Sequence, residues 1–108
     1  MKQWDIFSFQ PPGWPEPHPA VIVSHPSRVA NKPEVDVAMC SSRQAGRAPE
    51  GHEVMLDQED GLDWPTLCRC DLLYTVARSA LKRQRGTVAP ARRREIVRRI
   101  IAAHGWVE

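Results

Sequence analysis

Arg69 and Asp71 are the residues of this sequence whose types and spacing best suit chemistry on a phosphate. They lie two residues apart in a segment, residues 66–76, that is the longest strand candidate, so both side chains are expected on one face with Cα atoms ~6.5 Å apart. Metal-free RNA cleavage needs a base for the 2′-hydroxyl, an acid for the leaving 5′-oxygen and a cation opposite the developing negative charge. Asp71 suits the base, and Arg69 suits the cation or the proton donor; the cation role fits better, since a guanidinium is a poor acid. The same spacing also fits a surface ion pair without a catalytic role.

His18 is a second candidate for proton transfer. It stands between Pro17 and Pro19, which restrict its backbone, and imidazole titrates near neutral pH. The side chain therefore suits an acid or a base. An exposed loop histidine without a partner is the alternative interpretation.

Ser41, Ser42 and Arg43 directly follow a predicted strand, residues 35–40. Hydroxyl groups and a backbone turn can hold a phosphate there while the guanidinium neutralises it. These residues are therefore candidate RNA contacts, although serines at a strand end are often ordinary turn residues.

The cysteines and histidines do not have the spacing of a metal site. Cys68 and Cys70 are separated by one residue rather than two, and the four histidines include no pair at helical spacing. No glycine-rich phosphate loop, nucleophile elbow or metalloprotease motif is present either. We therefore expect no metal and no cofactor, and we expect Cys40, Cys68 and Cys70 to be reduced thiols.

The elements that must position these residues are short strands separated by turn signals. Prolines, glycines and polar clusters divide the chain into five or six predicted strands, at residues 3–10, 20–24, 35–40, 52–56 and 66–76, with residues 83–88 able to form a last, charged edge strand. Loops are expected between them, including the segment that holds Pro26 and Pro33, and residues 79–81 can form one helical turn. A terminal helix should start at Pro90 and end at Gly105. Its apolar stripe consists of Ile96, Val97, Ile100, Ile101 and His104. This pattern predicts a small β-barrel with a C-terminal amphipathic helix packed on it, in one domain spanning residues 1–108.

Composition and charge indicate an ordinary globular protein with a basic C-terminal part. The chain is 42% hydrophobic and 26% charged, and no apolar run approaches the ~20 residues that span a bilayer. No secretory signal pattern opens the sequence, so we expect a cytoplasmic location and no membrane partner. From Thr66 onward ten Lys and Arg face three acids, roughly +7, whereas residues 1–65 sum to roughly −5. The basic part can attract a phosphate backbone, or can simply be a solvated helix face.

Taken together, these segments resemble the MazF/PemK/Kid family of toxins over nearly the whole chain. Trp4-Asp5-Ile6 resembles the family's Gly-Asp-Ile opening, and residues 18–24 resemble its Arg-Pro-Ala-Leu-Val-Val-Ser run. Ser41-Ser42 falls where the family has Thr-Ser, and Arg69-Cys70-Asp71 matches the Arg-Cys-Asp of PemK and Kid.

The resemblance implies an SH3-like barrel of the MazF/CcdB type, usually a homodimer, that binds single-stranded RNA across the dimer. Cleavage would proceed through a 2′,3′-cyclic phosphate without metal. Arg69 and Asp71 would act at the scissile phosphate, Ser41 and Ser42 would help hold it, and a cognate antitoxin peptide would compete for the same surface.

Two positions depart from the family pattern. His18 stands where the family has arginine, and Tyr74-Thr75 stands where it has Arg-Thr, which leaves Thr75 as the expected RNA contact. The hypothesis is therefore a sequence-selective, metal-independent endoribonuclease toxin. The alternative is a catalytically degenerate barrel of the same fold that acts as a non-enzymatic RNA- or protein-binding toxin module.

Overall fold

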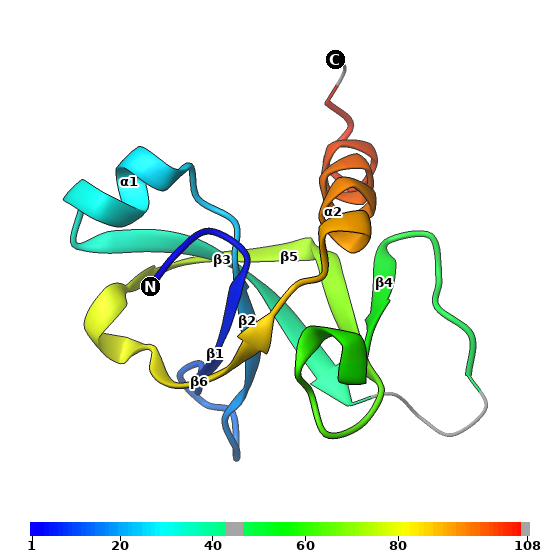
Figure 1. The fold of residues 1–108 in the computed structure, drawn as a ribbon, viewed down its shortest axis with the longest axis horizontal. Coiled ribbons are helices and arrows are strands. Elements are labelled where there is room, and N and C mark those ends of the chain that lie inside the picture. Colours follow the sequence, from blue (N-terminus) through cyan, green and yellow to red (C-terminus); the bar gives the residue numbers. More distant parts are fainter. Residues whose placement is uncertain (43–46, 107–108) are drawn as a thin grey trace.

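The computed structural model describes residues 1–42 and 47–106, which form one curled antiparallel sheet with helices at its edges (Figure 1). The six strands are β1 (Asp5–Phe9), β2 (His18–Ile22), β3 (Glu34–Ser42), β4 (Glu53–Leu56), β5 (Thr66–Ala77) and β6 (Lys82–Thr87), in the spatial order β4-β5-β3-β2-β1-β6. The helices are α1 (Pro26–Asn31) and α2 (Pro90–Ala103), with single 3-10 turns η1 (Gln58–Asp60) and η2 (Arg78–Ala80). This arrangement confirms the predicted small barrel-like β fold with a C-terminal helix.

The strand predictions agree with the structure within two residues, and the second strand begins and ends two residues earlier than predicted. β2 begins at His18 because His18 pairs with Phe9 and Pro19 with Ser8 on β1. Pairing with β3 starts only at Ala20, so the missing N–H of Pro19 costs no bond on that side. As a result, His18 lies within the sheet rather than in the loop before it.

Helix α1 was predicted as a loop, which is wrong. Pro26 occupies the first turn of the helix, where its missing N–H is harmless, and His25 caps the helix by accepting the Ser27 N–H at its Nδ1 (3.1 Å). Val29 is buried and packs on the sheet, which stabilises a segment too short to be helical on its own.

Packing of the apolar side chains produces two buried clusters. One lies under α2 and includes Ile6, Leu56 and Ile96, and the other includes Phe9, Val37 and Met39. All three cysteines are buried free thiols, as predicted. Cys40 on β3 lies opposite Cys68 on β5 in the strand register.

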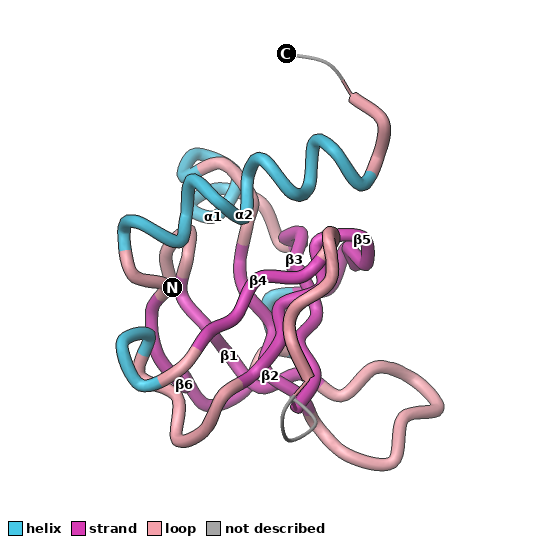
Figure 2. Tube along the Cα trace, turned by 90° about the vertical axis from the view of Figure 1, so that its right-hand side faces the viewer, coloured by secondary structure: helices cyan, strands magenta, loops and turns pink. Residues whose placement is uncertain are grey.

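Helix α2 begins at Pro90 as predicted and ends just before Gly105, whose φ of +70° lies in the left-handed region. It packs against β4 and β5 and crosses above one end of the sheet (Figure 2). The predicted apolar stripe is only partly buried: Ile96 is fully buried, whereas Val97 is 42% exposed and His104 is also exposed. The last turns of α2 extend past the sheet (Figure 2), so the sheet does not cover their apolar side chains. Within residues 1–42 and 47–106, neither helix has the length and apolar character needed to cross a membrane.

The η1 turn joins the two edges of the sheet. It follows β4, yet its Asp60 carbonyl lies so close to Gly86 on β6 that a Cβ there would come within 2.0 Å of the oxygen. The buried Asp60 carboxylate also accepts the backbone N–H of Ala89 (2.8 Å) and contacts Arg92 of α2. A backbone contact therefore ties the η1 turn to β6, and the Asp60 side chain ties it to the start of α2.

Candidate functional site

A large bulge in β5 carries the Arg69-Cys70-Asp71 triplet. Along β3 the pairing passes from Ala38, opposite Leu73, to Cys40, opposite Cys68, so residues 69–72 of β5 face the single residue Met39. Bulges of this kind bend a strand and redirect its side chains. The bulge is held from the other side by β4, where Glu53 pairs with Arg69.

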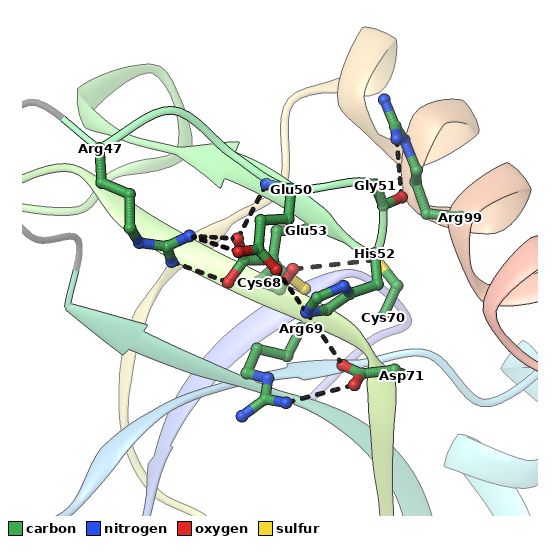
Figure 3. Close-up of polar contacts among 10 residues, drawn as sticks. All are labelled: Arg47, Glu50, Gly51, His52, Glu53, Cys68, Arg69, Cys70, Asp71 and Arg99. Atoms are coloured by element: carbon green, nitrogen blue, oxygen red, sulfur yellow. Dashed lines mark hydrogen bonds and ion pairs between the residues drawn. The ribbon is translucent and has the colours of Figure 1, made fainter.

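Arg69 and Asp71 contact each other and remain open to solvent. Arg69 Nη2 lies 3.2 Å from Asp71 Oδ2, and their side chains are 40% and 35% exposed (Figure 3). The Arg69 Nε is buried without a hydrogen-bond partner among the described residues, so the guanidinium is bound only at its outer edge. The spacing in sequence thus produces the predicted side-by-side pair, and this pair faces outward rather than into the barrel.

Cys70 lies between them but points into the core. A hydrogen bond with Cys68 and then burial raise the pKa of the Cys70 thiol far above its usual range. A thiol that stays protonated is a poor nucleophile. Cys70 therefore packs the bulge against the core, while its two neighbours are available for chemistry.

His52 is a site residue that the sequence analysis missed. It immediately precedes β4, and its Nε2 lies 4.0 Å from Asp71 Oδ1 and 3.9 Å from Glu50 Oε2, with 32% of the side chain exposed. Its backbone carbonyl accepts the N–H of Cys70 (2.8 Å). The loop of residues 57–65 leaves the register of this strand pair undetermined in the sequence, so no local pattern points to His52 as the neighbour of Asp71.

Glu53 is the cross-strand partner of Arg69, but its charge is neutralised by Arg47. Two hydrogen bonds of 2.9 Å join the Arg47 guanidinium to the Glu53 carboxylate, which is nearly buried and also accepts the Glu50 N–H. These contacts, the Arg47 bonds above all, lower the pKa of Glu53 to about 2. Arg69 is therefore left to pair with Asp71.

The same region brings together metal-ligating atom types without forming a convincing metal site. Atoms of Glu50, His52 and Glu53 lie within 4.8 Å of one another. Both carboxylate oxygens of Glu53 are already bound by Arg47, however, so an ion would have to break that pair. We assign no metal to this cluster.

Ser41, Ser42 and Arg43 are the other candidates near the start of β5. Ser41 and Ser42 were expected just after the third strand, which is wrong: they are the last residues of β3, because they pair with Leu67 and Thr66 at the start of β5. They thus adjoin the strand that carries Arg69. Arg43 lies outside the described residues.

His18 and Thr75 contact residues other than Arg69 and Asp71. The His18 ring packs edge-on against Trp14, with 4.9 Å between the ring centroids, and within the described part of the chain no hydrogen bond or ion pair joins it to Arg69 or Asp71. Thr75 donates a 2.6 Å hydrogen bond to Asp36 Oδ1. It lies four residues beyond Asp71, ~13 Å along the strand.

Comparison with protein families gives a match over nearly the whole chain. Residues 2–104 match the family described as PemK-like, MazF-like toxin of type II toxin-antitoxin system. No curated protein matches the sequence significantly.

Solved structures share the fold. The Mycobacterium tuberculosis toxin MazF-mt6 superposes with a TM-score of 0.81 at 22% identity, covering 96% of this chain and 99% of that one. A mycobacterial endoribonuclease in complex with its cognate antitoxin gives 0.79 at 18% identity, covering 100% and 96%. A MazE-MazF structure from Deinococcus radiodurans gives 0.75 at 16%, covering 99% and 97%. At these identities the structural likeness establishes the fold alone.

Proposed function

The chain belongs to the family of PemK-like, MazF-like toxins of type II toxin–antitoxin systems, and from this membership we propose that it is a sequence-selective, metal-independent endoribonuclease. The observation that carries the proposal is the Arg69–Asp71 pair, joined at 3.2 Å and open to solvent on the β5 bulge. A cation and a carboxylate presented together can bind a phosphate and move a proton beside it.

In the proposed reaction Asp71 removes the proton of the 2′-hydroxyl, whose oxygen attacks the adjacent phosphorus. Arg69 stabilises the negative charge that develops on the non-bridging oxygens. The P–O5′ bond breaks, which leaves a 2′,3′-cyclic phosphate on one fragment and a 5′-hydroxyl on the other. DNA should not be cut, because it lacks the attacking hydroxyl.

Further RNA contacts are proposed along the neighbouring strands. Ser41 and Ser42 would hold the phosphate beside the start of β5, with Arg43 as an added cation. His18 would act as a donor or proton-transfer group from the start of β2. Thr75 would contact the RNA farther along β5 and away from the scissile phosphate, since it lies four residues beyond Asp71.

The proposed partners are a second copy of the chain and a cognate antitoxin. An open groove of about 310 Å³ beside α2 is lined by apolar side chains that include Trp4, Leu73, Val97, Ile101 and Trp106. Val97 and Trp106 are 42% and 57% exposed, which is costly for large apolar side chains unless a partner covers them. This groove supports a homodimer. The antitoxin complex of the mycobacterial endoribonuclease supports the antitoxin as a partner, and we propose that it competes with RNA for the same surface.

The test is incubation of the purified protein with several long single-stranded RNAs in EDTA, with cleavage sites mapped by sequencing. Wild type should cut at a short recurring motif. Asp71→Asn and Arg69→Ala should each cut at least about 100-fold more slowly. Intact RNA together with growth arrest on expression would instead support the non-enzymatic toxin module, and normal cutting by both variants would exclude this site.

A further inference from the structure

The proposed reaction needs two proton transfers, and the Arg69–Asp71 pair supplies a good group for only one of them. Asp71 can take the proton of the 2′-hydroxyl, but the leaving 5′-oxygen must gain a proton as its bond to phosphorus breaks. A guanidinium is a poor acid at neutral pH. A second group is therefore needed that can give a proton to the leaving oxygen.

We propose that His52 is the general acid that protonates the leaving 5′-oxygen, an inference that rests on the proposed ribonuclease function. The His52 Nε2 lies 4.0 Å from Asp71 Oδ1, while Oδ2 of the same carboxylate contacts Arg69. Figure 3 shows the imidazole pointing toward Asp71 from the turn that precedes β4. Base, cation and acid then lie side by side on one exposed surface.

The spacing of His52 and Asp71 suits an in-line displacement. The attacking and leaving oxygens stand on opposite sides of the phosphorus, and two-metal sites that clamp both oxygens hold their metals about 3.5–4 Å apart. The 4.0 Å between Nε2 and Oδ1 is close to this spacing. Asp71 can thus bind the attacking oxygen and His52 the leaving oxygen, while Arg69 binds a non-bridging oxygen.

The step is balanced in protons and electrons. The 2′-oxygen gives its proton to Asp71 and forms the new bond to phosphorus, and His52 gives its Nε2 proton to the 5′-oxygen as the P–O5′ bond breaks. The enzyme ends the step with a neutral imidazole and a protonated carboxyl group. Solvent restores both, since the two side chains are 32% and 35% exposed.

The backbone around His52 is fixed independently of its ring. The His52 carbonyl accepts the Cys70 N–H (2.8 Å), and the carbonyl of Gly51 accepts a 2.7 Å bond from Arg99 on α2. The turn is therefore anchored to both β5 and α2. Removing the imidazole leaves these bonds in place, so a variant can lose the acid without losing the local fold.

Several charged groups lie near the imidazole. Glu50 lies 3.9 Å away in the same turn, Asp71 faces it from β5, Glu53 follows it on β4, and Arg99 reaches the turn from α2. Arg69 binds the other oxygen of the Asp71 carboxylate. The ring lies between the Glu50 and Asp71 carboxylates. His18 has no such setting, since its contact is with Trp14.

A leaving group that needs no proton tests this assignment. The substrate is a short RNA containing the motif mapped for wild type, made with either the natural 5′-oxygen or a 5′-sulfur at the scissile bond. A thiolate leaves readily without protonation, because thiols are far stronger acids than alcohols. His52→Ala should cut the oxygen substrate about 100-fold or more slowly than wild type and the sulfur substrate at nearly the wild-type rate.

The controls separate the acid from other roles. Asp71→Asn should be slow on both substrates, because the base acts on the 2′-hydroxyl in each. His25→Asn, which keeps an N-cap acceptor on α1 far from the site, should match wild type on both. On the oxygen substrate, the fall in kcat/KM at high pH should be present in wild type and absent in His52→Ala.

The outcomes distinguish the two proposals. Equal slowing of His52→Ala on both substrates, or a wild-type rate on the oxygen substrate, overturns the role of His52 while the ribonuclease stands. A wild type that cuts no RNA overturns both.

Discussion

Glu53 and Arg69 are direct partners across β4 and β5, yet each binds another residue: the Glu53 carboxylate is bound by Arg47 and the Arg69 guanidinium by Asp71. Arg47 therefore satisfies a nearly buried negative charge that would otherwise compete for Arg69. The cation proposed to meet the phosphate stays at the surface because a second arginine neutralises its cross-strand neighbour.

Replacing Arg47 by Met should destabilise the protein at pH 7, because Glu53 keeps its charge and loses both hydrogen bonds. In wild type the pKa of Glu53 is lowered to about 2 from 4.5, so the Arg47 contribution is fully present above pH 4.5 and is lost as pH falls through 2. Urea unfolding at pH 7, 4 and 2.5 should show a stability difference between the two proteins that shrinks as the pH falls and is smallest at pH 2.5. Glu50→Gln, at an exposed carboxylate, is the control, and a constant difference at all three pH values would contradict this account.

The freed carboxylate of Glu53 should also compete with the phosphate for Arg69. RNA cleavage by Arg47→Met is therefore expected to fall, and the double variant Arg47→Met with Glu53→Gln should recover it, because the competing charge is removed. Initial cleavage rates at pH 7 measure this. A double variant as slow as the single one would show that Arg47 acts in some other way.

Replacing Asp60 by Ala should cost about 3 kcal/mol. Its side chain is fully buried and binds both the Ala89 N–H and Arg92, so truncation leaves a buried donor without its acceptor and removes one of the two carboxylates, with that of Asp57, that hydrogen-bond Arg92. Glu59→Ala is the matched control: this carboxylate is 74% exposed and 3.8 Å from the same guanidinium, so its loss should cost less than about 1 kcal/mol. Equal losses of unfolding free energy for the two variants in urea would contradict the stabilising role of the buried Asp60 carboxylate.

Replacing Gly86 by Ala should destabilise the fold by about 3 kcal/mol, because the new Cβ would lie 2.0 Å from the backbone oxygen of Asp60 and the two segments must separate. The control is Gly51→Ala, where no atom lies within 4 Å of the added methyl group. Thermal unfolding of the two variants should differ by several degrees or more. A Gly86→Ala protein as stable as Gly51→Ala would show that the β6 and η1 backbones are not in close contact.

Replacing Val97 by Glu should convert a dimer into a monomer if the apolar groove beside α2 is the proposed interface, because a buried unpaired charge is strongly unfavourable there. Light scattering after gel filtration measures the mass in solution. Ala91→Glu introduces the same charge at an exposed position near the start of α2 and should leave the mass unchanged. A Val97→Glu protein that remains dimeric would place the interface elsewhere.

The sequence alone determined the features that depend on local periodicity. The two-residue spacing of Arg69 and Asp71 put their side chains together, since a strand repeats every two residues. Pro90 and Gly105 marked the ends of the terminal helix because their backbone preferences act within one turn. Alternating short strands and turns were enough to predict a barrel-like fold.

Only the tertiary structure decided which distant residues meet. The β5 bulge opposite Met39, the approach of His52 to Asp71, and the choice of Arg47 rather than Arg69 as the partner of Glu53 all depend on the register between strands joined by long connections. Register is set by the summed packing of whole strands, so no short pattern encodes it. Helix α1 was missed for the same reason, because burial of Val29 against the sheet stabilises a helix that six residues could not maintain alone.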